Sequence, residues 1–154
     1  MKVMKIITLT IIASVILMFG CSSPKPFEIK DVCAQPEGTN AILQGYLSLP
    51  KTIDTIQLTK GGRIMQVGYQ IFLMTKADAT GDAVKVTIWT TPKSEGEPNK
   101  IKPLPMTGYT WNDLIVYTDD GKEVPAGKII KITGETTPDT KTGCSVGVSK
   151  IELP

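Results

Sequence analysis

The 154-residue chain contains no histidine, and its only arginine is Arg63. The lack of histidine excludes Ser-His-Asp triads, Cys-His dyads, histidine metal sites and the most common general base of enzymes. There is no G-x-S-x-G motif, and residues 60–64, KGGRI, lack the spacing and the Gly-Lys-Ser/Thr ending of a phosphate-binding loop. The sequence therefore predicts a protein that is not an enzyme and has no cofactor.

The first 20 residues contain a long charge-free run. Lys2 and Lys5 form a basic front, and residues 6–19 carry no charge. A helix of this run spans roughly 21 Å, which is shorter than the ~30 Å hydrocarbon core of a bilayer. A basic front, a short apolar run and then a small residue, here Gly20, are typical of a secretory signal peptide. A buried apolar helix and an uncleaved anchor are the alternatives.

The end of this run, Leu17-Met18-Phe19-Gly20-Cys21, resembles the lipobox of bacterial lipoproteins. In that family the peptide is cut before the cysteine, which is then acylated and holds the protein to a membrane. The resemblance implies a signal peptide over residues 1–20, followed by a lipidated Cys21 and a tether over residues 21–39. It also implies a place in the cell envelope, facing the periplasm or the exterior. Ser22 after the cysteine implies the outer membrane if the envelope is Gram-negative.

Two further cysteines lie near opposite ends of the exported part of the chain. An exported protein meets an oxidising compartment, so we expect a disulfide between Cys33 and Cys144, with two unpaired thiols as the alternative. Two separated cysteines without histidine do not supply the four ligands of a structural zinc site. We therefore expect no metal.

The chain without its leader has no net charge. Two of its 17 lysine and arginine residues, Lys2 and Lys5, lie in the leader, which leaves 15 basic residues against 15 acidic residues. A neutral domain lacks the long-range attraction to phosphates that drives nucleic-acid binding. We therefore expect no nucleic-acid partner.

Short alternating segments separated by glycine-rich turns dominate the rest of the chain. Alternation is clearest over residues 83–91, where Lys85, Thr87 and Trp89 are expected on the outer face. Gly61-Gly62 predicts a tight hairpin turn, and Gly68 is expected at a bulge. The proline-rich residues 92–105 exclude a regular helix or central strand there. Seven strands are expected, over residues 40–49, 55–59, 64–76, 83–91, 114–118, 128–134 and 146–153.

The second half of this region resembles bacterial OB-fold domains. Residues 121–135, GKEVPAGKIIKITGE, resemble the fourth strand of that family, and residues 146–152, VGVSKIE, resemble the fifth. The first three strands would come from residues 40–49, 69–76 and 83–91. The resemblance implies an all-β domain over residues 40–154 that forms a small OB-like Greek-key barrel. Seven short strands also suit an immunoglobulin-like β-sandwich, which is the alternative.

Five residues are candidates for ligand contact. In an OB barrel, ligands usually meet the face of the second and third strands. Trp89 beside Lys85 would offer an aromatic ring and a cation to a sugar, a base or a peptide side chain, unless Trp89 packs under the proline-rich segment. Tyr109 and Trp111 either plug the barrel or line a groove. Arg63 meets a carboxylate or a phosphate, or lies on a solvated turn.

These expectations converge on a lipid-anchored envelope protein with a non-catalytic binding domain. The first interpretation is a protein-interaction or assembly subunit that docks onto another envelope protein. The alternative is a module that binds a glycan or small ligand through Trp89, Tyr109 or Trp111. Because fold does not dictate function, the distinction depends on the surface of the folded domain.

Overall fold

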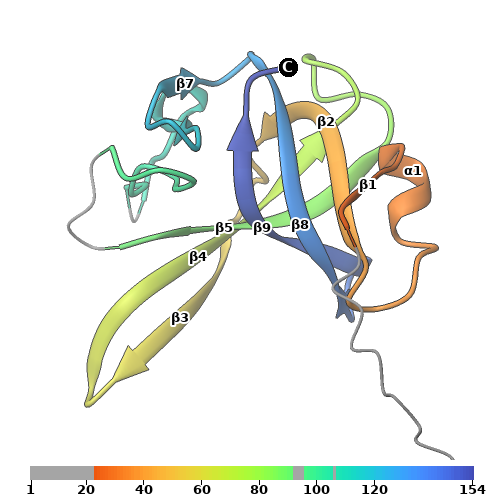
Figure 1. Cartoon of the computed structure of the whole chain (residues 1–154). Coiled ribbons are helices and arrows are strands. Elements are labelled where there is room, and N and C mark those ends of the chain that lie inside the picture. Colours follow the sequence, from red (N-terminus) through yellow and green to blue (C-terminus); the bar gives the residue numbers. More distant parts are fainter. Residues whose placement is uncertain (1–22, 92–95, 106) are drawn as a thin grey trace, which may run out of the picture.

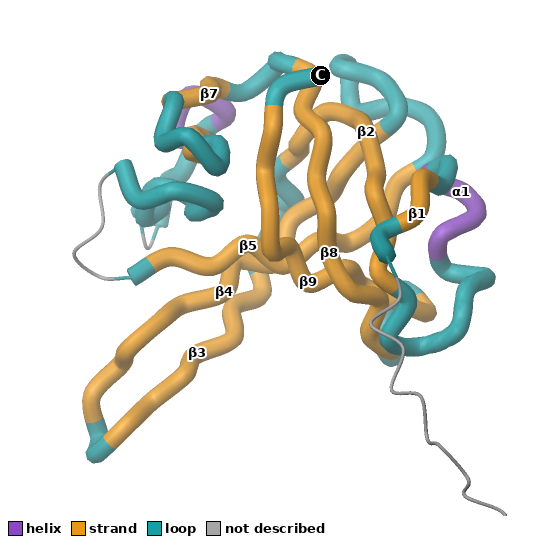
Figure 2. Tube along the Cα trace, in the orientation of Figure 1, coloured by secondary structure: helices purple, strands orange, loops and turns teal. Residues whose placement is uncertain are grey.

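The computed structural model describes residues 23–91, 96–105 and 107–154. Strands dominate these residues, and the helical elements are short (Figures 1 and 2). In chain order the elements are β1 (Lys25–Pro26), α1 (Ile29–Val32), β2 (Asn40–Ser48), β3 (Asp54–Lys60), β4 (Arg63–Met74), β5 (Ala83–Thr90), the 3-10 helix η1 (Trp111–Asp113), β6 (Ile115–Tyr117), β7 (Glu123–Pro125), β8 (Ile129–Asp139) and β9 (Gly143–Glu152).

Five of the strands form a ring. One sheet has the order β1-β2-β8-β9-β5-β4-β3, and β2 also pairs with β4, so the pairing returns to its start (Figure 1). Neighbours in the ring are antiparallel except for β5 and β9, which are parallel. The all-β class expected from the sequence is confirmed. β1–β5, β8 and β9 share one curled sheet, whereas a sandwich would have two large facing sheets. β6, which lies in the strand expected over residues 114–118, pairs with β7 in a separate two-stranded sheet.

Gly45 in β2 allows the ring to close. A Cβ at this position would lie 2.5 Å from the Met74 carbonyl oxygen and 3.0 Å from Cδ1 of Ile29. Real Cβ atoms do not approach a backbone oxygen so closely, so any other residue would push β2 away from the end of β4 or displace α1. Glycine in a strand often marks such a close approach of two backbones.

The core lies inside the ring and is made of branched aliphatic side chains. On β5 the apolar row expected to point inward, Val84, Val86 and Ile88, is buried. The opposite side of β5 is less open than we expected. Lys85 and Thr87 are also buried there, and Trp89 is half-buried.

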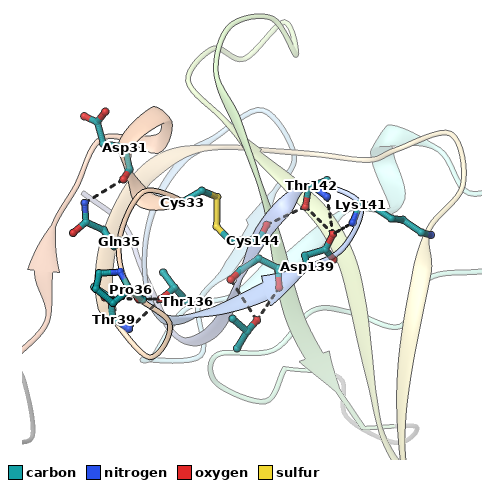
Figure 3. The surroundings of a disulfide bond; sticks show 12 residues. Asp31, Cys33, Gln35, Pro36, Thr39, Thr136, Asp139, Lys141, Thr142 and Cys144 are labelled. Atoms are coloured by element: carbon teal, nitrogen blue, oxygen red, sulfur yellow. Dashed lines mark hydrogen bonds between the residues drawn. A yellow bond between two sulfur atoms is a disulfide. The ribbon is translucent and has the colours of Figure 1, made fainter.

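The residues that precede β2 are part of the domain. Ile29 and Val32 of α1 are buried in the core, and Cys33 at the end of α1 forms the expected disulfide with Cys144 in β9 (Figure 3). The folded domain therefore begins before residue 40, within the segment that the lipobox resemblance assigns to a tether. The predicted signal peptide and Cys21 lie outside the described residues.

Residues 96–105 and 107–114, which follow β5, contain no strand longer than an isolated bridge, but they pack against the core. Ile101, Leu104 and Leu114 are buried, and Ile101 forms a β-bridge with Val116 of β6. Its backbone N–H also donates to the Trp89 carbonyl oxygen, at 3.2 Å. These contacts join the segment to the end of β5.

β3 and the first part of β4 leave the ring as a two-stranded protrusion (Figures 1 and 2). We call residues 54–67 the arm. Its turn, Gly61-Gly62, has positive φ at both residues, as the hairpin prediction requires. The register shifts beside Leu58, which leaves Met65 as the extra residue of a bulge. The expected bulge at Gly68 was wrong, because Gly68 pairs in regular register with Ile56 on one side and Trp89 on the other. A Cβ at Gly68 would lie 2.9 Å from Cγ2 of Thr87 and 3.1 Å from the Trp89 ring.

Candidate functional site: an apolar arm between two grooves

The arm exposes four large apolar side chains. Ile56, Leu58, Ile64 and Met65 are 41%, 49%, 44% and 52% exposed. All seven residues of β3 are exposed. A two-stranded ribbon is at best marginally stable alone in water, and an exposed apolar patch usually marks an interaction site. The arm is therefore the part of the described surface best suited to contact another molecule.

The tip of the arm is basic. Arg63 is the cross-strand neighbour of Lys60, so two like charges lie side by side next to the Gly61-Gly62 turn. Like charges that face each other across a strand pair repel each other. Arg63, a predicted contact residue, thus lies at the tip of the arm and outside both grooves described below.

The base of the arm is joined to the turn between β8 and β9. Nζ of Lys141 lies 2.8 Å from Oδ2 of Asp54, the first residue of β3. This lysine holds the pKa of the Asp54 carboxyl below its ordinary value. Both side chains are exposed, so the pair orients the arm more than it stabilises the fold.

The first groove, which we call the Trp89 groove, lies between the arm and the β8–β9 hairpin. It has a volume of about 460 Å³. Trp89 supplies its aromatic wall, and the arm contributes Ile56. Polar groups come from Gln70, Glu135 and Thr137 among others. An aromatic face beside hydrogen-bonding groups is able to stack on a flat ligand and orient it.

Lys85 does not offer its ammonium group freely to this groove. Its Nζ donates to Oδ2 of Asp139 at 2.9 Å, and the two side chains are only 6% and 13% exposed. Oδ1 of the same carboxylate accepts from the backbone N–H groups of Lys141 and Thr142, at 2.9 and 2.8 Å (Figure 3). The hydrogen bond from Lys85 holds the pKa of Asp139 well below its ordinary range. The amine that the sequence analysis assigned to ligand contact is thus engaged in a buried ion pair.

Asp139 reaches Lys85 because β8 continues as far as Asp139. We had expected this strand to end at residue 134. Gly134 permits the strand to continue, since a Cβ there would collide with the Gly147 carbonyl oxygen of β9. The two backbones approach closely at this point, and the hairpin extends beyond the ring toward the arm.

The second groove, which we call the Tyr109 groove, lies on the other face of the arm. It has a volume of about 510 Å³, and its walls include Ile64 and Val67 of the arm. The Tyr109 hydroxyl donates to the Lys51 carbonyl oxygen at 2.7 Å. The Leu104 N–H donates to the Tyr69 hydroxyl oxygen at 3.2 Å. Both tyrosines thus hold the segment after β5 beside the arm.

The five predicted contact residues do not converge on one site. Trp89 and Tyr109 line different grooves, and Lys85 is buried in its ion pair with Asp139. Trp111 begins η1 and is 38% exposed, outside both grooves. The exposed apolar arm was not predicted. The sequence did contain a pair of alternating segments around Gly61-Gly62, from which the hairpin was predicted. It did not indicate that β3 and the first part of β4 extend beyond the ring.

Within the described ranges, no three cysteine, histidine or acidic side chains are grouped so that they could hold a metal ion. A membrane-spanning helix is likewise not found among residues 23–91, 96–105 and 107–154. No family model matches the chain, and no curated protein matches its sequence.

Proposed function

We propose that this protein is a lipid-anchored component of the cell envelope whose β domain acts by binding another protein, as an interaction or assembly subunit. The observation that carries the proposal is the arm, which presents exposed apolar side chains on a protrusion. The lipobox resemblance at Cys21 supports the anchor. The Cys33–Cys144 disulfide supports export, because structural disulfides persist in oxidising compartments.

The finer fold assignment also belongs to this proposal. We take the ring to be an OB-like barrel, with β2, β4, β5, β8 and β9 as its five strands. The support is that these strands occupy the five segments that resemble the family, and that they form one continuous ring. In this scheme the arm is an extension of the hairpin between the first and second barrel strands.

The mechanism is docking without chemistry. The pairing of β4 with β5 and the Lys141–Asp54 contact hold the base of the arm, while the arm carries its apolar side chains away from the core. Burial of apolar surface is the main favourable term in protein association. No strand of the described part of the chain pairs with the outer edge of β3, so its backbone groups are open to an added strand.

Crosslinking in intact envelopes tests this function. Full-length protein is crosslinked in its native membranes, purified and analysed by mass spectrometry. We expect a recurrent, stoichiometric protein partner, lost on Leu58→Glu because a carboxylate replaces apolar contact on the arm. Thr52→Glu adds the same charge just outside the arm and should retain the partner. A chain that crosslinks to no protein at all would contradict the proposal.

Binding of a glycan or small ligand is the second candidate, and the Trp89 groove favours it. The half-buried Trp89 ring lies beside polar side chains from β4 and β8 in a volume able to hold a sugar unit. Titration with cell-wall fragments while tryptophan fluorescence is monitored tests this candidate. A saturable change lost in Trp89→Ala but kept in Trp111→Ala would support it. A flat titration of the wild-type protein would reject it.

A further inference from the structure

β3 is a free edge of the sheet. Among residues 23–91, 96–105 and 107–154, only β4 pairs with β3, which stands at the end of the strand order. Proteins usually protect such edges by keeping them short, or with prolines, bulges or charges. This edge is seven residues long, and its charges are confined to its two ends, Asp54 and Lys60. The edge is therefore able to accept another strand.

β3 reads D-T-I-Q-L-T-K, with Gln57 in the middle. On either side of Gln57 the residue types mirror each other, apolar next to the centre and then threonine, and the two ends carry opposite charges. Two copies of this strand, aligned antiparallel with the two Gln57 residues opposite each other, match at every position. The resulting cross-strand pairs are Gln57 with Gln57, Ile56 with Leu58, Thr55 with Thr59, and Asp54 with Lys60.

We infer that the β3 edge binds a second copy of this chain, through antiparallel pairing of the two β3 strands about a twofold axis at Gln57. The inference rests on the proposed role of the arm in protein contact and names the partner. Each copy uses a single edge, so the assembly closes as a dimer and does not grow into a filament.

Charge complementarity favours a second copy over an unrelated protein. Within one chain, Lys60 has the like-charged Arg63 as its cross-strand neighbour. Asp54 has the neutral Gln70 across the strand pair, and its carboxylate forms an exposed ion pair with Lys141. In the dimer, Lys60 lies opposite Asp54 of the second copy, and the twofold axis repeats this pair. Opposite charges placed directly across two strands stabilise their pairing. The chain itself supplies the required pattern of charges.

Apolar contact between the two copies favours the same register of β3 pairing. Ile56 and Leu58 share one face of β3, since residues two apart point the same way. The twofold axis brings four of these side chains together, two from each copy, and each Ile56 lies opposite a Leu58. In the single chain they are 41% and 49% exposed. Pairing in this register therefore covers apolar surface that the single chain leaves in water.

Cysteine crosslinking tests the register. In Gln57→Cys the two introduced thiols face each other across the axis, where paired Cβ atoms lie about 5 Å apart. In Thr59→Cys they are four residues out of register, or roughly 13 Å apart. Both variants keep the native cysteines, so crosslinks through those appear in both. With full-length protein in its membranes and a short bis-thiosulfonate reagent, we expect a covalent homodimer for Gln57→Cys and monomer for Thr59→Cys.

Charge reversal tests the pairing at the ends of the strand. Asp54→Lys and Lys60→Asp each create two like-charge pairs across the axis and should raise the dimer dissociation constant roughly tenfold or more. The double variant D54K/K60D restores opposite charges and should restore the dimer. Asp54→Lys also removes the contact with Lys141, but the double variant lacks that contact too. Recovery in the double variant therefore reports the contact between chains.

Two results would overturn the inference. One is a monomer by sedimentation of the detergent-solubilised full-length protein, with Gln57→Cys uncrosslinked in membranes. The other is a dimer that all three charge variants leave unchanged. If the arm then crosslinks to a different envelope protein, the proposed interaction function stands while the second copy is rejected. If the arm crosslinks to no protein, both fail.

Discussion

Lys85 in the middle of the sheet and Asp139 at the end of β8 form an ion pair with a separation of 2.9 Å between Nζ and Oδ2. Their side chains are 6% and 13% exposed, so both charges are largely removed from water. The carboxylate also accepts two backbone hydrogen bonds from the β8–β9 turn. The pair thus joins β5 to the hairpin that borders the arm.

Lys85→Met should destabilise the fold by about 3 kcal/mol, because removal of one partner leaves a largely buried charge unpaired. Chemical denaturation measures the change in the free energy of unfolding. Lys141→Met is the matched control, since it removes an exposed ion pair with Asp54 and should change stability far less. Equal effects of the two substitutions would show that burial of the Lys85–Asp139 pair has no energetic weight.

Acid should weaken the domain through Asp139. Its pKa is lowered in the folded state from an ordinary value of 3.8. A carboxyl whose pKa is depressed by folding stabilises the protein above its unfolded pKa, and this contribution is lost as the pH falls toward the folded pKa. The stability difference between wild-type protein and Asp139→Asn should therefore be full at neutral pH and shrink below about pH 4. A difference that grows in acid would contradict this assignment.

Loss of the disulfide should destabilise the domain by about 4–5 kcal/mol in the chain-entropy model, because the bond closes a very long loop. Cys33 and Cys144 are 111 residues apart in sequence. Urea unfolding of the wild-type protein with and without reductant measures the effect. The Cys33→Ser/Cys144→Ser variant should resemble the reduced protein, and reductant should not change it further.

Gly45→Ala should destabilise the domain by about 2 kcal/mol, because its Cβ has no room beside the Met74 carbonyl oxygen. Gly147→Ala is the control, since the nearest atom to a Cβ there is 3.8 Å away, an ordinary contact. Thermal unfolding compares the two variants. A tolerated Gly45→Ala would mean that β2 and β4 separate easily and that ring closure contributes little.

Most of the strands could be predicted because alternation and turn chemistry are local. The Gly61-Gly62 hairpin and the inward row of β5 follow from residues that are neighbours in sequence. The helix α1 was missed because four residues are too few to show a helical repeat. The candidate site was predicted only in part, since Trp89 and Tyr109 line grooves whose other walls come from distant segments.

The sequence by itself determined the all-β class and the hairpin turn at Gly61-Gly62. It predicted the Cys33–Cys144 disulfide, with two unpaired thiols as the alternative, and the structure confirms the bond. The lipid anchor stays a prediction. Only the tertiary structure decided that Lys85 is buried, that α1 belongs to the core and that β3 stands outside the ring. Alternation shows which residues share a face of a strand, but contacts between segments far apart in sequence decide what covers that face.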